Sequence, residues 1–116
     1  MAKQKVVITG IGVVSPIGIG LENFWRGLLE SRCGIGKISL FDAESFPCRI
    51  AAEVRNFDAT PFMTPREQRA FSRATQFALS AYELARKDSG LTYLDPARTS
   101  VILGTSMNAF DVMEEQ

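Results

Sequence analysis

The feature that most constrains the fold is an apolar run near the start of the chain that contains two glycines. Residues 6–14, VVITGIGVV, consist only of Val, Ile, Thr and Gly. A continuous run of this kind is typical of a strand that is buried on both faces of a parallel sheet. Because Gly10 and Gly12 interrupt it, the run also predicts a place where another backbone packs closely.

The spacing of these glycines matches the start of a dinucleotide-binding loop, but the residues that follow argue against that function. Such a loop needs a third glycine three residues after the second, and that position holds Ser15. Pro16 comes next, and a proline disfavours the helical conformation in the residue before it. Since the helical pattern starts only after Gly20, we favour a structural role for the glycines.

Composition places the chain in an ordinary globular class. Of its 116 residues 46% are hydrophobic and the formal net charge is zero, which excludes a disordered chain and a strongly basic nucleic-acid-binding chain. No segment approaches the roughly 18 apolar residues of a membrane span. The start of the chain, MAKQKVVITG, is not a hydrophobic leader, so we expect a cytoplasmic protein. The cysteine spacing suits neither a disulfide framework nor a metal site, and the chain contains no histidine.

The rest of the chain predicts an α/β arrangement of strands and helices. Residues 21–30 place their apolar side chains on one face of a helix. Residues 48–54 alternate between two faces, as in a half-exposed strand, and residues 99–106 form another buried strand. The segments between these elements read as loops, and a last helix is expected to start at Asn108.

The longest predicted element is one helix over residues 65–89. Thr64 and Glu67 have the spacing of a capping box, with a proline at the first helical position. An alanine-rich apolar stripe then recurs at helical spacing, which would let another element approach closely. Gly90 suits the left-handed residue that ends such a helix.

Five sequence blocks, taken in order, carry a resemblance to one enzyme family. They are VVITGIGVVSPIG, FWRGLLESRCGIGKISLFD, CRIAAEV, TPREQRAFSRATQFALSAYELARKDSGL and VILGTS. Together they resemble the N-terminal end of a β-ketoacyl-[acyl-carrier-protein] synthase of the discrete, type II kind, a group that includes the discrete polyketide synthases. The resemblance covers nearly the whole chain.

This resemblance implies a thiolase-like fold, in which two similar α/β halves form α-β-α-β-α layers around mixed sheets. Residues 1–116 would be the N-terminal portion of the first half, and so an incomplete domain. In the family the glycine-containing strand is the first strand of the core and binds no nucleotide. The expected partners are acyl carrier protein, the rest of the synthase chain and a second copy in a homodimer, with no nucleic acid and no membrane.

The resemblance also implies a reaction, in which an acyl chain is extended by decarboxylative Claisen condensation with malonyl-carrier protein in fatty-acid or polyketide synthesis. The family uses a cysteine nucleophile and two histidines, all in later segments. We therefore expect no catalytic residue in this chain and no activity from it alone. Cys33 and Cys48 have no obvious activating partner in the sequence, and we interpret both as structural.

Two kinds of binding residue follow from the resemblance. Arg66 and Arg69 match a basic patch with which the family docks its acidic carrier protein. The next position, often lysine in relatives, is Ala70, while Arg73 follows one turn after Arg69. Met107 matches a position that lines the acyl-chain pocket. No metal and no cofactor are implied, because the substrates are carried on the phosphopantetheine of the carrier protein.

A second hypothesis belongs to a different functional class. A non-catalytic partner subunit, such as a chain-length-factor-like protein, would have an N-terminal portion of the same appearance. Sequence downstream of Gln116 separates the two hypotheses, since a catalytic cysteine there supports the enzyme and its replacement supports the partner subunit.

Overall fold

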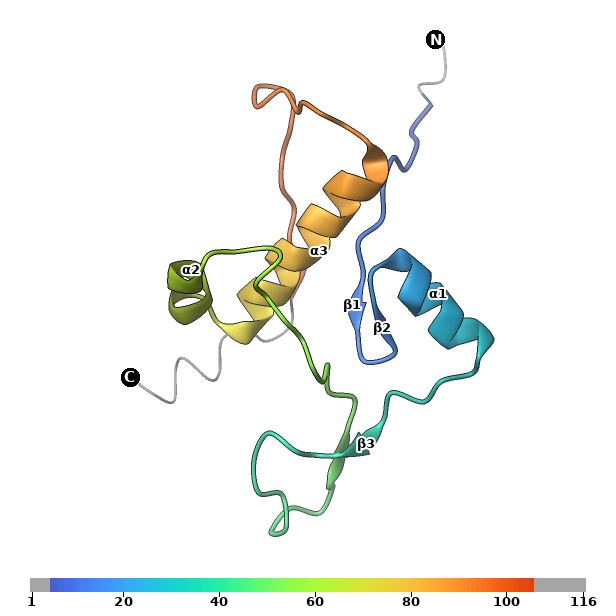
Figure 1. The fold of residues 1–116 in the computed structure, drawn as a ribbon, viewed down its shortest axis with the longest axis vertical. Helices are drawn as coiled ribbons and strands as arrows, with labels where there is room; N and C mark the ends of the chain where they lie inside the picture. Colours follow the sequence, from blue (N-terminus) through green and yellow to red (C-terminus); the bar gives the residue numbers. More distant parts are fainter. Residues whose placement is uncertain (1–4, 106–116) are drawn as a thin grey trace. The chain divides into compact units, whose positions relative to one another are not determined.

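The computed structural model describes residues 5–105 of the chain. Its elements, in chain order, are β1 (Val14–Ser15), β2 (Gly18–Ile19), α1 (Leu21–Leu29), β3 (Gly36–Lys37), β4 (Ile50–Ala51), α2 (Pro65–Ala70) and α3 (Arg73–Ser89) (Figure 1). The chain divides into two compact units. Unit 1 combines Met1–Gly12 with Ala59–Gln116, and unit 2 is Val13–Asp58.

Unit 2 opens with a tight hairpin that leads into α1. β1 pairs antiparallel with β2, and Val14 lies opposite Ile19. The Gly20 amide donates a hydrogen bond of 2.8 Å to the Val13 carbonyl, and the Gly20 φ of 81° is one that favours glycine. The chain therefore reverses at Pro16 and Ile17, directly after Ser15, and no helix starts where a dinucleotide-binding loop would need one.

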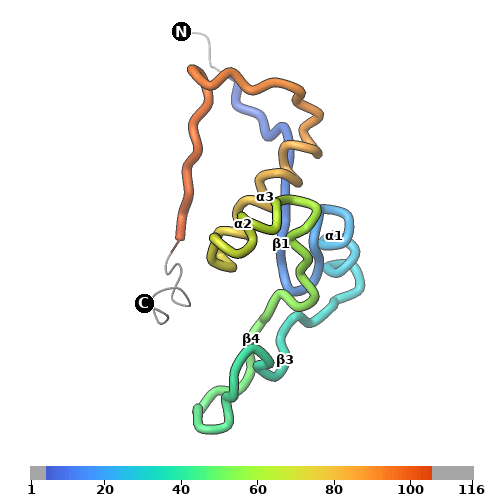
Figure 2. The backbone as a smooth tube through the Cα atoms, turned by 60° about the vertical axis from the view of Figure 1, so that its left-hand side comes forward, coloured from blue at the N-terminus to red at the C-terminus, as the bar shows by residue number. Residues whose placement is uncertain are grey.

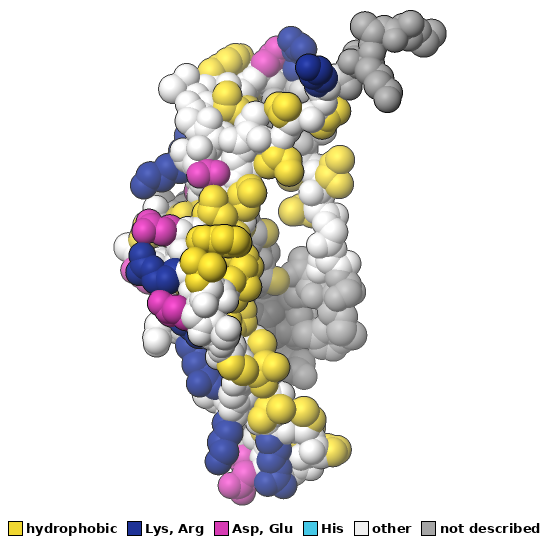
Figure 3. Space-filling model, turned by 90° about the vertical axis from the view of Figure 1, so that its right-hand side faces the viewer, with side chains coloured by type: hydrophobic (Ala, Val, Ile, Leu, Met, Phe, Trp, Pro, Cys, Tyr) yellow, Lys and Arg dark blue, Asp and Glu magenta, His cyan; other side chains and the backbone are white. Residues whose placement is uncertain are grey.

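The predicted helix over residues 21–30 is confirmed as α1, but its apolar face is not covered within unit 2. The side chains of Trp25 and Leu29 are 59% and 69% exposed. Gly27 is the buried residue of α1, and a Cβ there would lie 2.6 Å from the Ile17 carbonyl oxygen. The helix thus packs against the hairpin through its glycine, while hydrophobic side chains remain on the surface beside charged ones (Figure 3).

The second strand pair of unit 2 is shorter than predicted. Within residues 48–54 only β4 forms, and it pairs antiparallel with β3, Gly36 opposite Ala51 (Figure 2). β3 lies in a segment that the sequence predicts as loop, so that prediction is wrong for these two residues. A two-residue strand gives no alternation that a sequence pattern could reveal.

A buried carboxylate fastens this pair to the segment beside it. The side chain of Glu53 is 7% exposed. It accepts hydrogen bonds from the hydroxyl and the amide of Ser39, at 2.7 and 2.9 Å, and from the amide of Leu40 at 3.3 Å. These bonds, led by that of the Ser39 hydroxyl, lower the pKa of Glu53 to about 2. Arg55 adds an ion pair to Glu53 and a hydrogen bond to the Lys37 carbonyl.

In unit 1 the two glycines of the N-terminal run lie directly against α3. A Cβ on Gly12 would lie 1.8 Å from the Ala81 carbonyl oxygen, and one on Gly10 would lie 2.3 Å from that of Ala85. The Ile11 amide between them donates a 2.9 Å hydrogen bond to the Asp88 carboxylate. The prediction that these glycines mark a close backbone approach is therefore confirmed, and the neighbour is the alanine-rich face of α3.

The two long strands that the sequence predicts are not paired within the described residues. Only Val14 of residues 6–14 lies in a strand, and no strand is assigned within residues 99–105. Val6 and Ile102 are 94% and 91% exposed. The physical reason is that a strand needs a neighbour to complete its backbone hydrogen bonds, and neither segment has one in this part of the chain.

The predicted single helix over residues 65–89 is wrong at one point, where it divides into α2 and α3 (Figure 1). Phe71 and Ser72 have extended ψ angles of 136° and 156°. Ser72 then caps α3 by accepting a hydrogen bond from the Thr75 amide. The predicted capping box of α2 and the left-handed Gly90 after α3, with φ 66°, are both confirmed.

Candidate functional site

The candidate docking site is the surface of α2, where Arg66 and Arg69 both have exposed side chains. Neither arginine takes part in an ion pair or side-chain hydrogen bond within residues 5–105, whereas Arg26, Arg32, Arg55 and Arg86 each form an ion pair. Residues three apart lie on neighbouring positions of a helix surface. An anionic partner could therefore meet both guanidinium groups without first breaking an intramolecular ion pair.

Glu67, the acidic residue between these arginines, is hydrogen-bonded to Thr64 rather than paired with either arginine. The Glu67 carboxylate accepts hydrogen bonds from the Thr64 amide and the Thr64 hydroxyl, both at 2.7 Å. The Glu67 amide in turn donates to that hydroxyl at 3.4 Å. The bond from the Thr64 amide is the largest cause that lowers the pKa of Glu67. Because this carboxylate closes the capping box, α2 keeps its two cationic side chains available.

Neither Ala70 nor Arg73 extends this basic surface. Ala70, which ends α2, is exposed. Arg73 belongs to α3, beyond the break, and its guanidinium lies over the Phe77 ring at 4.9 Å from the centroid. Because the helix breaks between them, Arg73 does not lie one helical turn after Arg69. The Arg73 guanidinium is also partly engaged, since it lies against an aromatic face.

An apolar cavity lies in unit 1 between α3 and the segment that precedes Met107. Its volume is about 420 Å³. It is lined by Ala74, Thr75, Ala78, Leu79 and Tyr82 of α3 and by Val101, Leu103, Gly104 and Thr105. Met107 itself, like Asn108, lies outside the described residues, so its place as an acyl-pocket residue stays a prediction.

The two cysteines are exposed free thiols. The Cys33 thiol donates to the Ile35 carbonyl at 3.9 Å, and the Cys48 thiol donates to the Ile50 carbonyl at 3.5 Å. Both contacts are local and both acceptors are neutral, whereas an activated cysteine needs a base or a cation beside it. Within residues 5–105 no cluster of acidic, histidine or cysteine residues could hold a metal, and no helix could cross a membrane.

Comparison with known proteins decides the family. The family model for the β-ketoacyl synthase N-terminal domain matches residues 3–116. The chain belongs to the β-ketoacyl synthase family. The resemblance predicted from the five sequence blocks is therefore confirmed.

Individual relatives support the same placement. The 3-oxoacyl-[acyl-carrier-protein] synthase 2 of Synechocystis sp. is 39% identical, over 100% of this chain and 28% of that protein. The granaticin polyketide putative beta-ketoacyl synthase 1 of Streptomyces violaceoruber is 43% identical, over 97% of this chain and 27% of that protein. The chain thus spans less than a third of the length of these curated relatives.

A solved structure of this family supports the fold. The ishigamide ketosynthase/chain length factor structure superposes with a TM-score of 0.70 at 39% identity, over 78% of this chain and 23% of that one. The predicted fold class, the N-terminal part of a thiolase-like α/β fold, is confirmed.

Proposed function

We propose that this chain is the N-terminal portion of a β-ketoacyl-[acyl-carrier-protein] synthase, and that α2 docks the acyl carrier protein. The observation that carries the docking proposal is the pair of exposed cations, Arg66 and Arg69, neither of which has an ion pair among the described residues 5–105. Names of the relatives support the enzyme class, since they are 3-oxoacyl-[acyl-carrier-protein] and polyketide ketoacyl synthases.

In the proposed reaction a cysteine of the complete enzyme holds the acyl group as a thioester. A malonyl group on the carrier protein loses carbon dioxide, and the resulting carbanion attacks the thioester carbonyl. The cysteine thiolate leaves, and the extended β-ketoacyl chain stays on the carrier. The complete enzyme supplies the nucleophile and the histidines, while this chain supplies core strands, the docking helix and part of the acyl pocket.

Docking through α2 follows from charge and from geometry. A carrier protein of acidic character offers carboxylates and a phosphopantetheine phosphate, which arginine binds with paired N–H donors. Arg66 gains nothing from the helix itself, because it lies near the N-terminal end of α2, which already carries partial positive charge. Arg69 lies in the last turn of α2, where a cation is favoured.

The acyl pocket is proposed on different grounds. Met107 lies two residues after Thr105, which lines the apolar cavity against α3 together with Val101, Leu103 and Gly104. A methionine has a flexible, polarisable side chain that can move aside for an acyl chain. The relatives include 3-oxoacyl-[acyl-carrier-protein] synthases and polyketide ketoacyl synthases, so their names do not separate fatty-acid from polyketide synthesis. They give the chain-length-factor alternative no better support than the enzyme. We further propose a cytoplasmic homodimer.

The docking proposal is tested by reversing both charges, Arg66→Glu with Arg69→Glu, in the intact enzyme that contains this segment. Exposed charge pairs contribute up to about 1 kcal/mol each, so kcat/KM for carrier-bound substrate should fall roughly tenfold at low salt. A small thioester surrogate, which needs no docking, should react at the original rate. The loss should shrink at high ionic strength.

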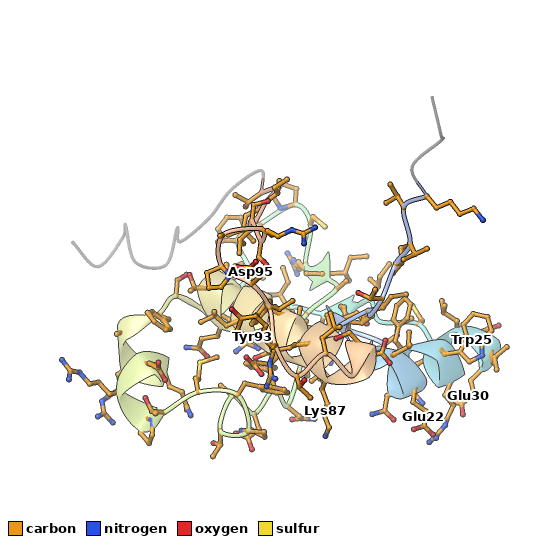
Figure 4. The ribbon with its side chains drawn as sticks, turned by 90° about the horizontal axis from the view of Figure 1, so that it is seen from above. Glu22, Trp25, Glu30, Lys87, Tyr93 and Asp95 are labelled. Carbon is orange, nitrogen blue, oxygen red and sulfur yellow. The ribbon has the colours of Figure 1, made fainter. Side chains whose placement is uncertain are left out.

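A matched control reverses two other exposed cations of unit 1, Lys87→Glu with Arg98→Glu (Lys87 is labelled in Figure 4). It changes the net charge equally and should leave both substrates unaffected. If the α2 variant slowed both substrates equally, its arginines would be structural. If it slowed neither, the carrier would dock elsewhere and the proposal would fail.

A further inference from the structure

The side chain of Gln76 bridges the junction between α2 and α3. Its amide nitrogen donates a hydrogen bond of 2.9 Å to the Gln68 carbonyl and one of 3.0 Å to the Phe71 carbonyl. Both acceptors lie at the C-terminal end of α2, whereas Gln76 lies in the first turn of α3. A single side chain therefore bridges the end of one helix to the start of the next.

The break in the helix explains why these two carbonyls need a donor. In an uninterrupted helix the Phe71 carbonyl would accept from the Thr75 amide, but the Ser72 hydroxyl takes that amide instead. The last carbonyls of α2 are then left without intrahelical partners. A primary amide carries two N–H donors, so Gln76 can satisfy both carbonyls at once.

The remaining contacts of the junction point the same way. Ser72 is buried, and its hydroxyl also lies 3.0 Å from that of Thr75. The Gln68 side chain donates in the opposite direction, to the Met63 carbonyl at 3.2 Å, and Met63 is buried. Each side of α2 is thus tied by a glutamine amide to a backbone carbonyl, which fixes the direction of a helix that has no buried residue of its own.

We propose that Gln76 is a positioning residue for carrier-protein docking. By holding the end of α2 on α3 it keeps Arg66 and Arg69 in the one orientation that meets the carrier. This inference rests on the proposed function of α2. Without the two hydrogen bonds α2 would sample several directions, and the apparent affinity for the carrier would fall by the fraction of time spent in the competent one.

The test is Gln76→Met in the intact enzyme that contains this segment, since methionine keeps the length and helix propensity but has no donor. We expect the KM for carrier-bound substrate to rise about three- to tenfold with kcat unchanged, and the small thioester to react at its original rate. Gln76→Glu keeps the length, also lacks the donors and should give at least the same rise. Lys87→Met removes an exposed polar side chain from the same helix and should change nothing.

The Arg66→Glu, Arg69→Glu background separates the two proposals. A positioning residue acts through the arginines, so Gln76→Met should add no further rise in KM once they are reversed. If the arginine variant raised KM but neither Gln76 variant did, the positioning role would be refuted and docking would stand. If Gln76→Met also slowed the small thioester, its role would be structural only. If the arginine variant had no effect, both proposals would fail.

Discussion

Replacing Gly12 with alanine tests the close approach between the N-terminal run and α3. The added Cβ would lie 1.8 Å from the Ala81 carbonyl oxygen and 2.6 Å from the Ala85 amide nitrogen. Both atoms belong to the backbone of α3, so no change of rotamer can relieve the clash. Since Cβ atoms essentially never lie closer than 3.0 Å to such a neighbour, the segment has to move away by more than an ångström.

That movement has an energetic consequence that can be worked out. Forcing an extra methyl group into a packed contact costs about 1–3 kcal/mol. The shift would also stretch the hydrogen bond from the Ile11 amide to Asp88, now 2.9 Å, beyond its useful range, which adds about 1 kcal/mol. Because alanine lowers the conformational entropy of the unfolded chain, the substitution also stabilises the folded state by about 0.4–1 kcal/mol. The expected net loss in the free energy of unfolding is about 1–3 kcal/mol.

The assay is urea unfolding of the 116-residue chain, followed by far-ultraviolet circular dichroism at a concentration where light scattering shows no association. The matched control is Gly104→Ala, because a Cβ at Gly104 meets nothing within 4 Å. The control should unfold at the original urea concentration or slightly above it. If Gly12→Ala unfolded together with the control, the close approach would not contribute to stability, and the interpretation of both N-terminal glycines would be wrong.

Three further predictions concern unit 2 and the chain as a whole. The depressed pKa of Glu53, about 2, means that its contribution to stability is fully present above its ordinary pKa of 4.5 and is lost as the pH falls through about 2. The protection of the Ser39 amide against hydrogen exchange, measured relative to the intrinsic exchange rate at each pH, should fall across that window, and Glu53→Gln should abolish this fall. The same fall in the variant would contradict the role of Glu53. The exposed Val6, Trp25 and Leu29 should make the isolated chain associate or aggregate as its concentration is raised, which light scattering would contradict by showing a monomer at every concentration tested. The isolated chain should produce no condensation product by mass spectrometry, and turnover lost only in the Cys33→Ala, Cys48→Ala double variant would identify a nucleophile that our interpretation excludes.

Local chemistry made part of the fold predictable from the sequence. The capping box of α2, the left-handed Gly90 and the apolar face of α1 each depend on residues within one or two turns of one another. The close approach at Gly12 was also predictable, because only glycine has no Cβ. Its neighbour, the Ala81 face of α3, was not identified in advance, although the alanine stripe indicated a helix that another element could approach.

Other features depend on contacts that a local pattern does not contain. Residues 6–14 have a strand-forming composition, yet only Val14 of them lies in a strand, because strand pairing depends on partners that are distant in the sequence. The break at Phe71 was concealed by an apolar stripe that continues through it. Its available signal was the spacing of Ser72 and Thr75, which suits an N-cap. The role of Gln76 could not be predicted, because its acceptors are left open only by that break.

The exposure of Arg66 and Arg69 agrees with their expected place in the candidate site. Their spacing predicted that both lie on one helical surface. The structure adds that the Glu67 carboxylate accepts hydrogen bonds from Thr64. These hydrogen bonds could be predicted from the sequence, because the acidic residue of a capping box bonds back to the N-cap residue. The orientation of α2 could not be predicted from the sequence, because it depends on side-chain contacts across the junction with α3.

The central claim is that this chain is the N-terminal portion of a condensing enzyme. The most direct measurement incubates the intact enzyme that contains it with acyl-carrier protein and malonyl-carrier protein, and follows the carrier-bound products by mass spectrometry. The account predicts a β-ketoacyl chain two carbons longer than the starting acyl group, together with release of carbon dioxide. Active carrier substrates that remained unextended, with the malonyl group intact or merely decarboxylated, would contradict the claim.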